Sequence, residues 1–157
     1  MELEKEINQQ KFPSQRLKVL INILFTSSWF NSQQNQIFRG YDISWQQYNI
    51  LRILKGRKGQ PASLKMLTSR MIDRNSNTSR LVDKLEKKGY VARTPNEMDR
   101  RKVDIYLTDL GHEVANNAAK DTETLMDQNI NYLSKEEETQ LNTLLDKLRG
   151  PHCSRDI

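Results

Sequence analysis

The fold is decided by two stretches of sequence, residues 75–91, NSNTSRLVDKLEKKGYV, and residues 99–111, DRRKVDIYLTDLG. In the first, apolar residues recur at the three- and four-residue spacing of a helix, and a basic last turn precedes Gly89, a common helix stop. In the second, residues 103–107 alternate between apolar and other side chains, as on a half-buried strand. The sequence therefore predicts a helix over 75–88 that leads into a β-hairpin.

The hairpin and the segment before it complete a recognisable order of elements. A strand over 90–94, a charged loop over 95–102 and a strand over 103–107 form the hairpin. A shorter amphipathic segment starts at Pro61 and Ser63, and its inward-facing residues are expected to be Leu64, Leu67, Met71 and Ile72. Two short helices followed by a hairpin with a basic tip are the order of a winged helix-turn-helix, which places its second short helix in the major groove of DNA.

Longer helices flank this segment. A first helix is predicted over 14–38, and a second from Ser44 to just before Gly56. A further helix follows Thr108, and a last one begins at Ser134, which stands three residues before Glu137 in capping-box spacing, and ends at Gly150. The predicted fold class is therefore mainly α with a small β-hairpin (α+β).

Composition and charge favour a partner that is a polyanion. The chain has 157 residues and a net charge of +5, with 29% charged and 36% hydrophobic residues, which leaves a lean core. Residues 1–59 carry +5, residues 60–108 carry +5 and residues 109–157 carry −5. This asymmetry suggests a basic body that meets nucleic acid and an acidic tail kept away from it; a merely solvated charged surface is the alternative.

Several classes of function are disfavoured. The single Cys153 rules out an intramolecular disulfide and a cysteine-based zinc cage, and fits a reducing, cytoplasmic location. The longest apolar stretch falls short of the roughly 20 residues that span a bilayer, so no membrane association is expected. His112 and His152 are too few for a histidine metal site or a catalytic triad, and no phosphate-binding glycine loop occurs. We therefore expect no enzyme, no catalytic residue, no metal and no cofactor.

The helix over 75–88 carries polar and cationic residues on the side away from its apolar stripe, and these are the candidate DNA contacts. Arg80 has the donor geometry for guanine O6 and N7, and Asn77 that for adenine N6 and N7; an ordinary solvated position is the alternative for each. The hairpin tip adds cations that suit the negative potential of a minor groove. The candidate set is Asn75, Ser76, Asn77, Ser79, Arg80, Lys84, Asp99, Arg100, Arg101 and Lys102.

These two stretches resemble the recognition helix and wing of MarR-type transcriptional regulators, and the order of helices over about residues 14–149 resembles that family too. The resemblance implies a homodimer that binds a pseudo-palindromic double-stranded operator, in most cases as a repressor. It implies that Arg101 enters the minor groove, that Asp99 orients Arg101, and that Arg80, Ser79 and Lys84 contact DNA. Thr78 stands where the family commonly has an apolar residue, so either helix packing is looser there or a hydroxyl lies near the phosphate backbone.

The resemblance also divides the chain by role. It implies an N-terminal dimerisation helix in 1–40, the winged domain in 41–108, C-terminal dimerisation helices in 109–149 and a tail in 150–157. Apolar residues match the family's positions for the dimer contact, although an ordinary intramolecular core is the alternative interpretation. These residues are Leu17, Leu20, Leu24, Leu141, Leu144, Leu145 and Leu148.

Two questions stay open at the level of sequence. Many members of the family bind a small aromatic ligand, and the matching aromatic residues here are Trp29, Phe30, Trp45 and Tyr48. Aromatic residues at helical spacing are also common in cores, which is the alternative. The second question is whether the winged fold acts as a protein-interaction module without an operator of its own.

Overall fold

The computed structural model of the chain describes residues 2–96, 98–99, 102–129 and 131–150. The chain forms two compact units, one that ends at Trp45 and one that begins at Gln46. In the described residues no helix combines the length and the apolar character that crossing a membrane requires.

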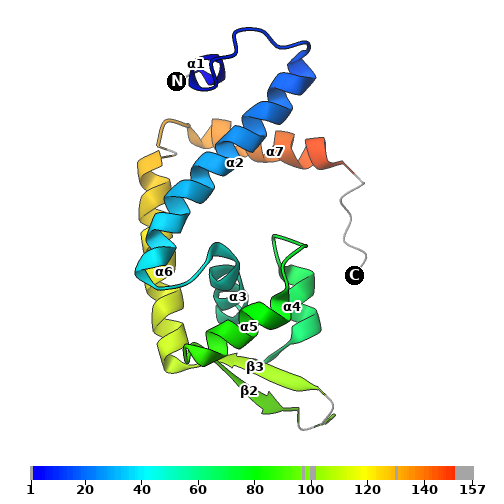
Figure 1. Ribbon diagram of the computed structural model, residues 1–157, viewed down its shortest axis with the longest axis vertical. Helices are drawn as coiled ribbons and strands as arrows, with labels where there is room; N and C mark the ends of the chain where they lie inside the picture. Colours follow the sequence, from blue (N-terminus) through cyan, green and yellow to red (C-terminus); the bar gives the residue numbers. More distant parts are fainter. Residues whose placement is uncertain (1, 97, 100–101, 130, 151–157) are drawn as a thin grey trace. The chain divides into compact units, whose positions relative to one another are not determined.

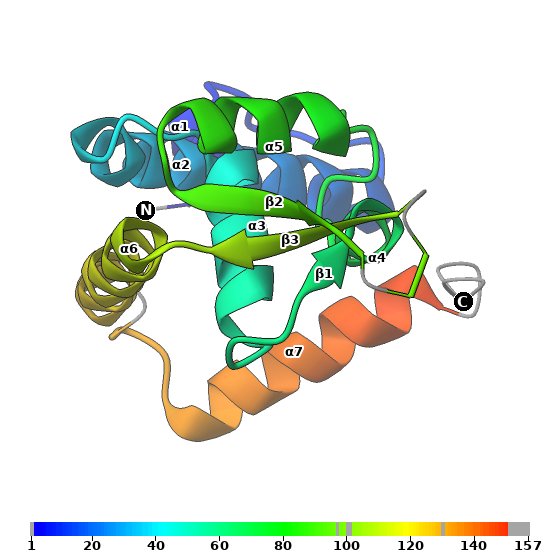
Figure 2. The same cartoon turned by 90° about the horizontal axis from the view of Figure 1, so that it is seen from below.

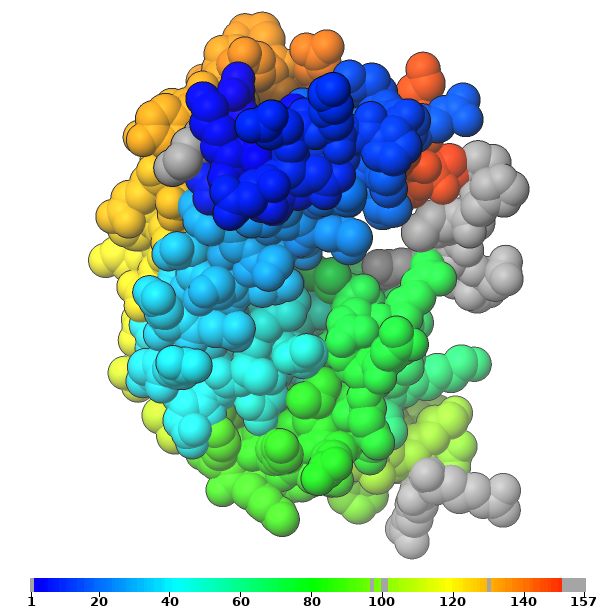
Figure 3. Space-filling view, turned by 45° about the horizontal axis from the view of Figure 1, so that its top comes forward, coloured from blue at the N-terminus to red at the C-terminus, as the bar shows by residue number. Residues whose placement is uncertain are grey.

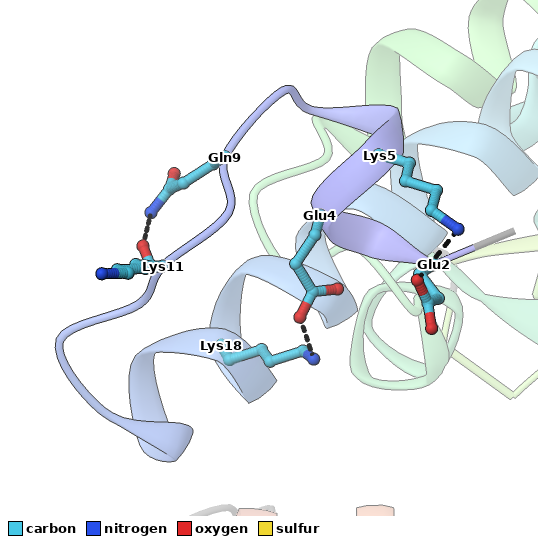
Figure 4. A network of polar contacts seen from close by, with 6 residues as sticks. All are labelled: Glu2, Glu4, Lys5, Gln9, Lys11 and Lys18. Carbon is cyan, nitrogen blue, oxygen red and sulfur yellow. Dashed lines mark hydrogen bonds and ion pairs between the residues drawn. The ribbon is translucent and has the colours of Figure 1, made fainter.

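The first unit is built on the long helix α2, Gln15–Gly40, which follows one short helical turn, α1, Leu3–Glu6. Ser14 starts α2, because its side chain accepts a hydrogen bond from the backbone N–H of Leu17 at 3.2 Å. The helix predicted over 14–38 is confirmed and runs two residues further, whereas α1 was not predicted. Figure 4 shows the ion pair between Glu4 of α1 and Lys18 of α2 that joins the two helices.

The second unit holds the winged segment (Figures 1 and 2). Helix α3, Trp45–Lys55, leads through a loop to the two-residue strand β1, Ala62–Ser63, and then to α4, Leu64–Arg70, and α5, Thr78–Lys87. Strands β2, Val91–Pro95, and β3, Val103–Leu107, follow. The side chain of Ser63 caps α4 and accepts from the N–H of Met66, so the predicted start of this segment is confirmed.

The sheet is antiparallel with strand order β1-β3-β2. Ile105, at the centre of β3, is paired with Ala62 on one side and Arg93 on the other. The sequence predicted only the hairpin; the third strand is an addition, since β1 pairs with the free edge of β3. Helix α5 lies beside β2 in both views.

The core of this unit joins α3, α4, α5 and the sheet. Full burial of a large aliphatic side chain contributes about 1.5–3 kcal/mol, so these residues dominate the stability of the winged segment. Its largest fully buried apolar side chains are Ile50, Leu51, Leu67, Met71, Val82, Leu85, Val91 and Ile105.

The structure corrects the predicted orientation and bounds of several residues. Leu64 and Ile72 were expected to face inward, but they are 37% and 54% exposed, because α4 ends at Arg70 and buries Leu67 and Met71 instead. The helix predicted from Asn75 begins at Thr78. The first strand of the hairpin is shifted by one residue, from 90–94 to 91–95.

Two helices follow the sheet. Helix α6, Asp109–Asn129, starts after Thr108 as predicted, and Thr108 caps it, since its Oγ1 accepts from the N–H of Gly111 at 3.0 Å. Helix α7, Lys135–Arg149, begins with the predicted capping box of Ser134 and Glu137, with both hydrogen bonds present. Helix α7 has no buried residue, in contrast to the other long helices.

Candidate nucleic-acid interface

Two side chains shape the turn before α5. Asp73 accepts the backbone N–H of Asn75 on Oδ1 at 3.0 Å, and its backbone oxygen accepts the N–H of Ser76 at 3.2 Å. Asn77 caps the helix, with Oδ1 accepting the N–H of Arg80 at 3.1 Å. Asn75, Ser76 and Asn77 therefore lie before the helix. The Asn77 oxygen has a second lone pair, so the cap is compatible with a further hydrogen bond to a base.

The outer side of α5 is cationic. At 3.6 residues per turn, Arg80, Lys84 and Lys87 lie opposite the buried side of the helix, and all three are exposed. We call these three residues the cationic side of α5. Ser79 is exposed beside them. In the space-filling view of Figure 3, the green surface of α5 adjoins the yellow-green surface of the strands.

A shallow depression of about 330 Å³ lies along the N-terminal half of α5. Gln46, in the first turn of α3, contributes to it and was not predicted as a site residue. The amide of Gln46 adds a neutral donor and acceptor beside the cations, a group suited to phosphate or base edges. The depression is lined by Gln46, Asp73, Ser76, Asn77, Arg80, Leu81 and Lys84.

Asn96 organises the base of the wing. Its Oδ1 accepts the backbone N–H groups of Met98 and Asp99 at 3.1 and 2.9 Å, and its Nδ2 donates to Asp104 Oδ2 at 2.9 Å. Its own N–H donates to the Lys102 carbonyl at 3.0 Å. One side chain thus fixes both arms of the hairpin tip, a role the sequence analysis did not assign.

The predicted wing cations are described only in part. Arg100 and Arg101 lie outside the described residues. Lys102 forms an ion pair with Asp99, with Nζ 3.4 Å from Oδ2. The expectation that Asp99 orients Arg101 stays a prediction.

Arg93 of β2 was also missed, and it connects the strand to α5. Its Nη2 lies 2.5 Å from Asp83 Oδ1 and its Nη1 lies 3.1 Å from Glu86 Oε2. Directly opposed residues of an antiparallel pair project to the same side of the sheet, so Arg93 shares the inward side of buried Ile105. An arginine in phase with the buried Val91 is the sequence signal that could have found this contact.

The four aromatic residues predicted for a ligand site are engaged in packing. The rings of Trp29 and Phe30 meet edge to face with centroids 4.7 Å apart, and Trp45 lies 5.9 Å from Phe38. Tyr48 is 5% exposed. Burial raises the pKa of Tyr48, and a hydrogen bond with Thr122 of α6 partly offsets this. Phe30 and Trp45 are half-buried and Trp29 is 37% exposed, so the core alternative fits Tyr48 alone, and the ligand site stays a prediction.

The apolar residues expected at the dimer contact are largely uncovered in the single chain. In α2, Leu20 and Leu24 are 52% and 61% exposed, and Leu17 is half-buried. In α7, Leu145 is half-buried, and the exposed members of the stripe are Leu141 at 47%, Leu144 at 54% and Leu148 at 59%. Each unit therefore carries an apolar stripe without a partner in the described part of its own unit.

The described residues contain no group of three or more His, Cys, Asp or Glu side chains placed to hold a metal ion.

The chain is similar to known regulators. The MarR family model matches residues 43–103. The HTH-type transcriptional regulator PecS of Dickeya dadantii (strain 3937) is 33% identical over 117 residues, which are 73% of this chain and 69% of PecS.

Two solved structures share the fold. The organohalide-sensing regulator RdhR-CbdbA1625, in a form with bound 2,4-dichlorophenol, has a TM-score of 0.79 and 19% identity, over 90% of this chain and 85% of that one. A mutant MarR from E. coli in complex with operator DNA has a TM-score of 0.70 and 23% identity, over 94% and 99% of the two chains. At these identities the likeness shows the winged fold.

Proposed function

The chain belongs to the MarR family of transcriptional regulators, and from that premise we propose that it is a homodimer that binds a pseudo-palindromic operator in double-stranded DNA as a repressor. The observation that carries the proposal is the cationic side of α5, which is exposed and stands beside the hydroxyl and amide groups of the capping turn. Helix α5 would lie in the major groove and the wing in the minor groove. We propose no enzymatic activity, and a location in the cytoplasm with the DNA.

The charges on this side predict how binding responds to salt. Each phosphate that a cation neutralises releases counterions, so affinity falls linearly with salt on a logarithmic scale. Arg80 would read a base as well as a phosphate, whereas Lys84 would contact the backbone alone. Asn96 supports the contact between the wing and the minor groove, because its hydrogen bonds hold Met98 and Asp99, which precede the wing cations in the sequence.

The uncovered leucines of α2 and α7 support the homodimer. Contiguous apolar patches on a chain mark contact surfaces, and α7 buries none of its residues within the single chain. A second copy would cover both stripes and place two winged segments on one duplex, one helical turn apart.

The proposal also includes a small aromatic ligand whose binding releases the DNA. The support is the dichlorophenol held by the structurally similar RdhR-CbdbA1625. Such a ligand acts only if it binds the form unable to hold DNA more tightly than the competent form. The chain has 2 tryptophans, Trp29 and Trp45, and both are candidate ligand residues. Titration with 2,4-dichlorophenol should quench their fluorescence and weaken DNA binding over the same concentration range; unchanged fluorescence and affinity would remove this part.

The test of DNA binding is selection from random duplex DNA at physiological salt, followed by sequencing. We expect enrichment of an inverted repeat with half-sites about one helical turn apart. Replacing Arg101 by Ala should then weaken binding to all sequences, whereas Arg80→Ala should also relax preference at particular base pairs. Recovery of unselected sequence would instead favour the protein-interaction module.

A further inference from the structure

Asp83 and Glu86 are the acidic residues of α5, and they stand beside the surface proposed to meet DNA. At 3.6 residues per turn, both lie on the flank between the buried side and the cationic side of the helix. Their side chains are 47% and 41% exposed. Unpaired, they would oppose the approach of phosphates.

Arg93 reaches both carboxylates at once. Its two terminal nitrogens lie 2.5 Å from Asp83 and 3.1 Å from Glu86. The planar guanidinium presents its donors as a fixed fork, which a lysine cannot reproduce. The Arg93 side chain is 28% exposed, less than either carboxylate, so the contact is made from the strand side of the helix.

We propose that Arg93 is a positioning residue for DNA recognition, which draws both carboxylates of α5 toward β2 and neutralises them, so that the helix presents its cationic side to DNA without opposing charge. This inference rests on the proposed DNA binding. It adds a residue outside the recognition helix and the wing tip that controls affinity without contacting DNA.

The contact has little weight in folding. All three side chains are partly exposed to solvent, where ion pairs add little to stability, and the buried residues next to the contact, Val82, Leu85 and Val91, hold α5 on the sheet. Variants of Arg93 are therefore expected to fold, which allows binding to be measured on its own.

The experiment measures the affinity of the full chain for operator DNA, obtained by selection with the unaltered chain, over a series of salt concentrations. Arg93→Gln should weaken binding by about tenfold at low salt, with a smaller loss as salt rises, because repulsion from two released carboxylates is screened. The affinity of Arg93→Lys should lie between those of Arg93→Gln and the unaltered chain, since an ammonium pairs with one carboxylate at a time. The decisive variant is Arg93→Gln with Asp83→Asn and Glu86→Gln, which should return affinity to within about threefold of the unaltered chain.

The matched control is Lys135→Gln, which removes one cation from exposed α7 and should change affinity less than about twofold. If the triple variant binds as weakly as Arg93→Gln, Arg93 is a structural brace and the proposal is wrong. Unchanged affinity in Arg93→Gln overturns it as well. An unaltered chain that selects no operator contradicts the proposed function itself, a result distinct from these two.

Discussion

Gly111 lies where the first turn of α6 meets the end of α5. A Cβ at this position would stand 1.9 Å from the carbonyl oxygen of Tyr90, a backbone atom in the turn between α5 and β2. Thr108 fixes the same contact, with Oγ1 donating to the Gly89 carbonyl at 2.6 Å. We expect Gly111→Ala to lower the free energy of unfolding by about 2–4 kcal/mol, measured by urea denaturation, because α6 must move off the turn.

Gly40, the last residue of α2, is the control for that substitution. Nothing lies within 4 Å of a Cβ built there. Gly40→Ala should leave stability unchanged or raise it by up to about 1 kcal/mol, through helix propensity. An equal loss at both glycines would contradict the steric explanation.

Thr78 answers a question that the sequence left open. It is 4% exposed, and its Oγ1 is buried without a hydrogen-bond partner in the described residues, so the hydroxyl lies in the core rather than at the phosphate backbone. A buried hydroxyl without a partner costs about 1–3 kcal/mol, and valine has the same shape. Thr78→Val should therefore raise the midpoint of thermal unfolding while DNA affinity stays the same. A lower midpoint would mean that the hydroxyl is satisfied.

At the scale of elements, the contact between α1 and α2 is sensitive to pH. The hydrogen bond from Lys18 holds the pKa of Glu4 below its ordinary value of 4.5. A lowered pKa in the folded state means that the contact is intact above 4.5 and is lost as the pH falls through the lowered pKa. We expect the protection of the α1 amides against hydrogen exchange to decline in that acid range, after correction for intrinsic rates.

Two variants test this assignment at neutral pH. Glu4→Gln should reduce the protection of the α1 amides at neutral pH as acid does in the unaltered chain, since it removes the charge that Lys18 pairs with. Glu2→Gln should not, because Glu2, the residue before α1, pairs with Lys5 of α1 at 3.2 Å and has no ion pair with α2 among the described residues. If the α1 amides exchange equally fast in both variants, the Glu4–Lys18 ion pair is not the contact that protects α1.

Elements with local signals were predictable from the sequence, whereas contacts between elements were not. The capping box of Ser134 and Glu137 fixed the start of α7, because both hydrogen bonds form within one turn. Strand β1 has two residues, too few for alternation, and exists because β3 has a free edge. The candidate DNA contacts of α5 could be predicted because they share one side of a single helix. The role of Arg93 could not, because it depends on carboxylates that only the fold brings to it.

At the scale of the whole molecule, the leucine stripe of α7 should decide whether the chain can hold an operator. Leu144→Asp with Leu148→Asp would place charges on a surface that the proposed homodimer buries, and each buried, unpaired charge opposes association strongly. We expect a monomer by sedimentation, with operator affinity reduced by about a hundredfold or more, since two linked half-sites bind far more tightly than one. Thr139→Asp with Thr143→Asp adds the same charge to the opposite side of α7, so this control should stay dimeric and bind normally. A dimer that survives the leucine variant would show that α7 does not form the contact.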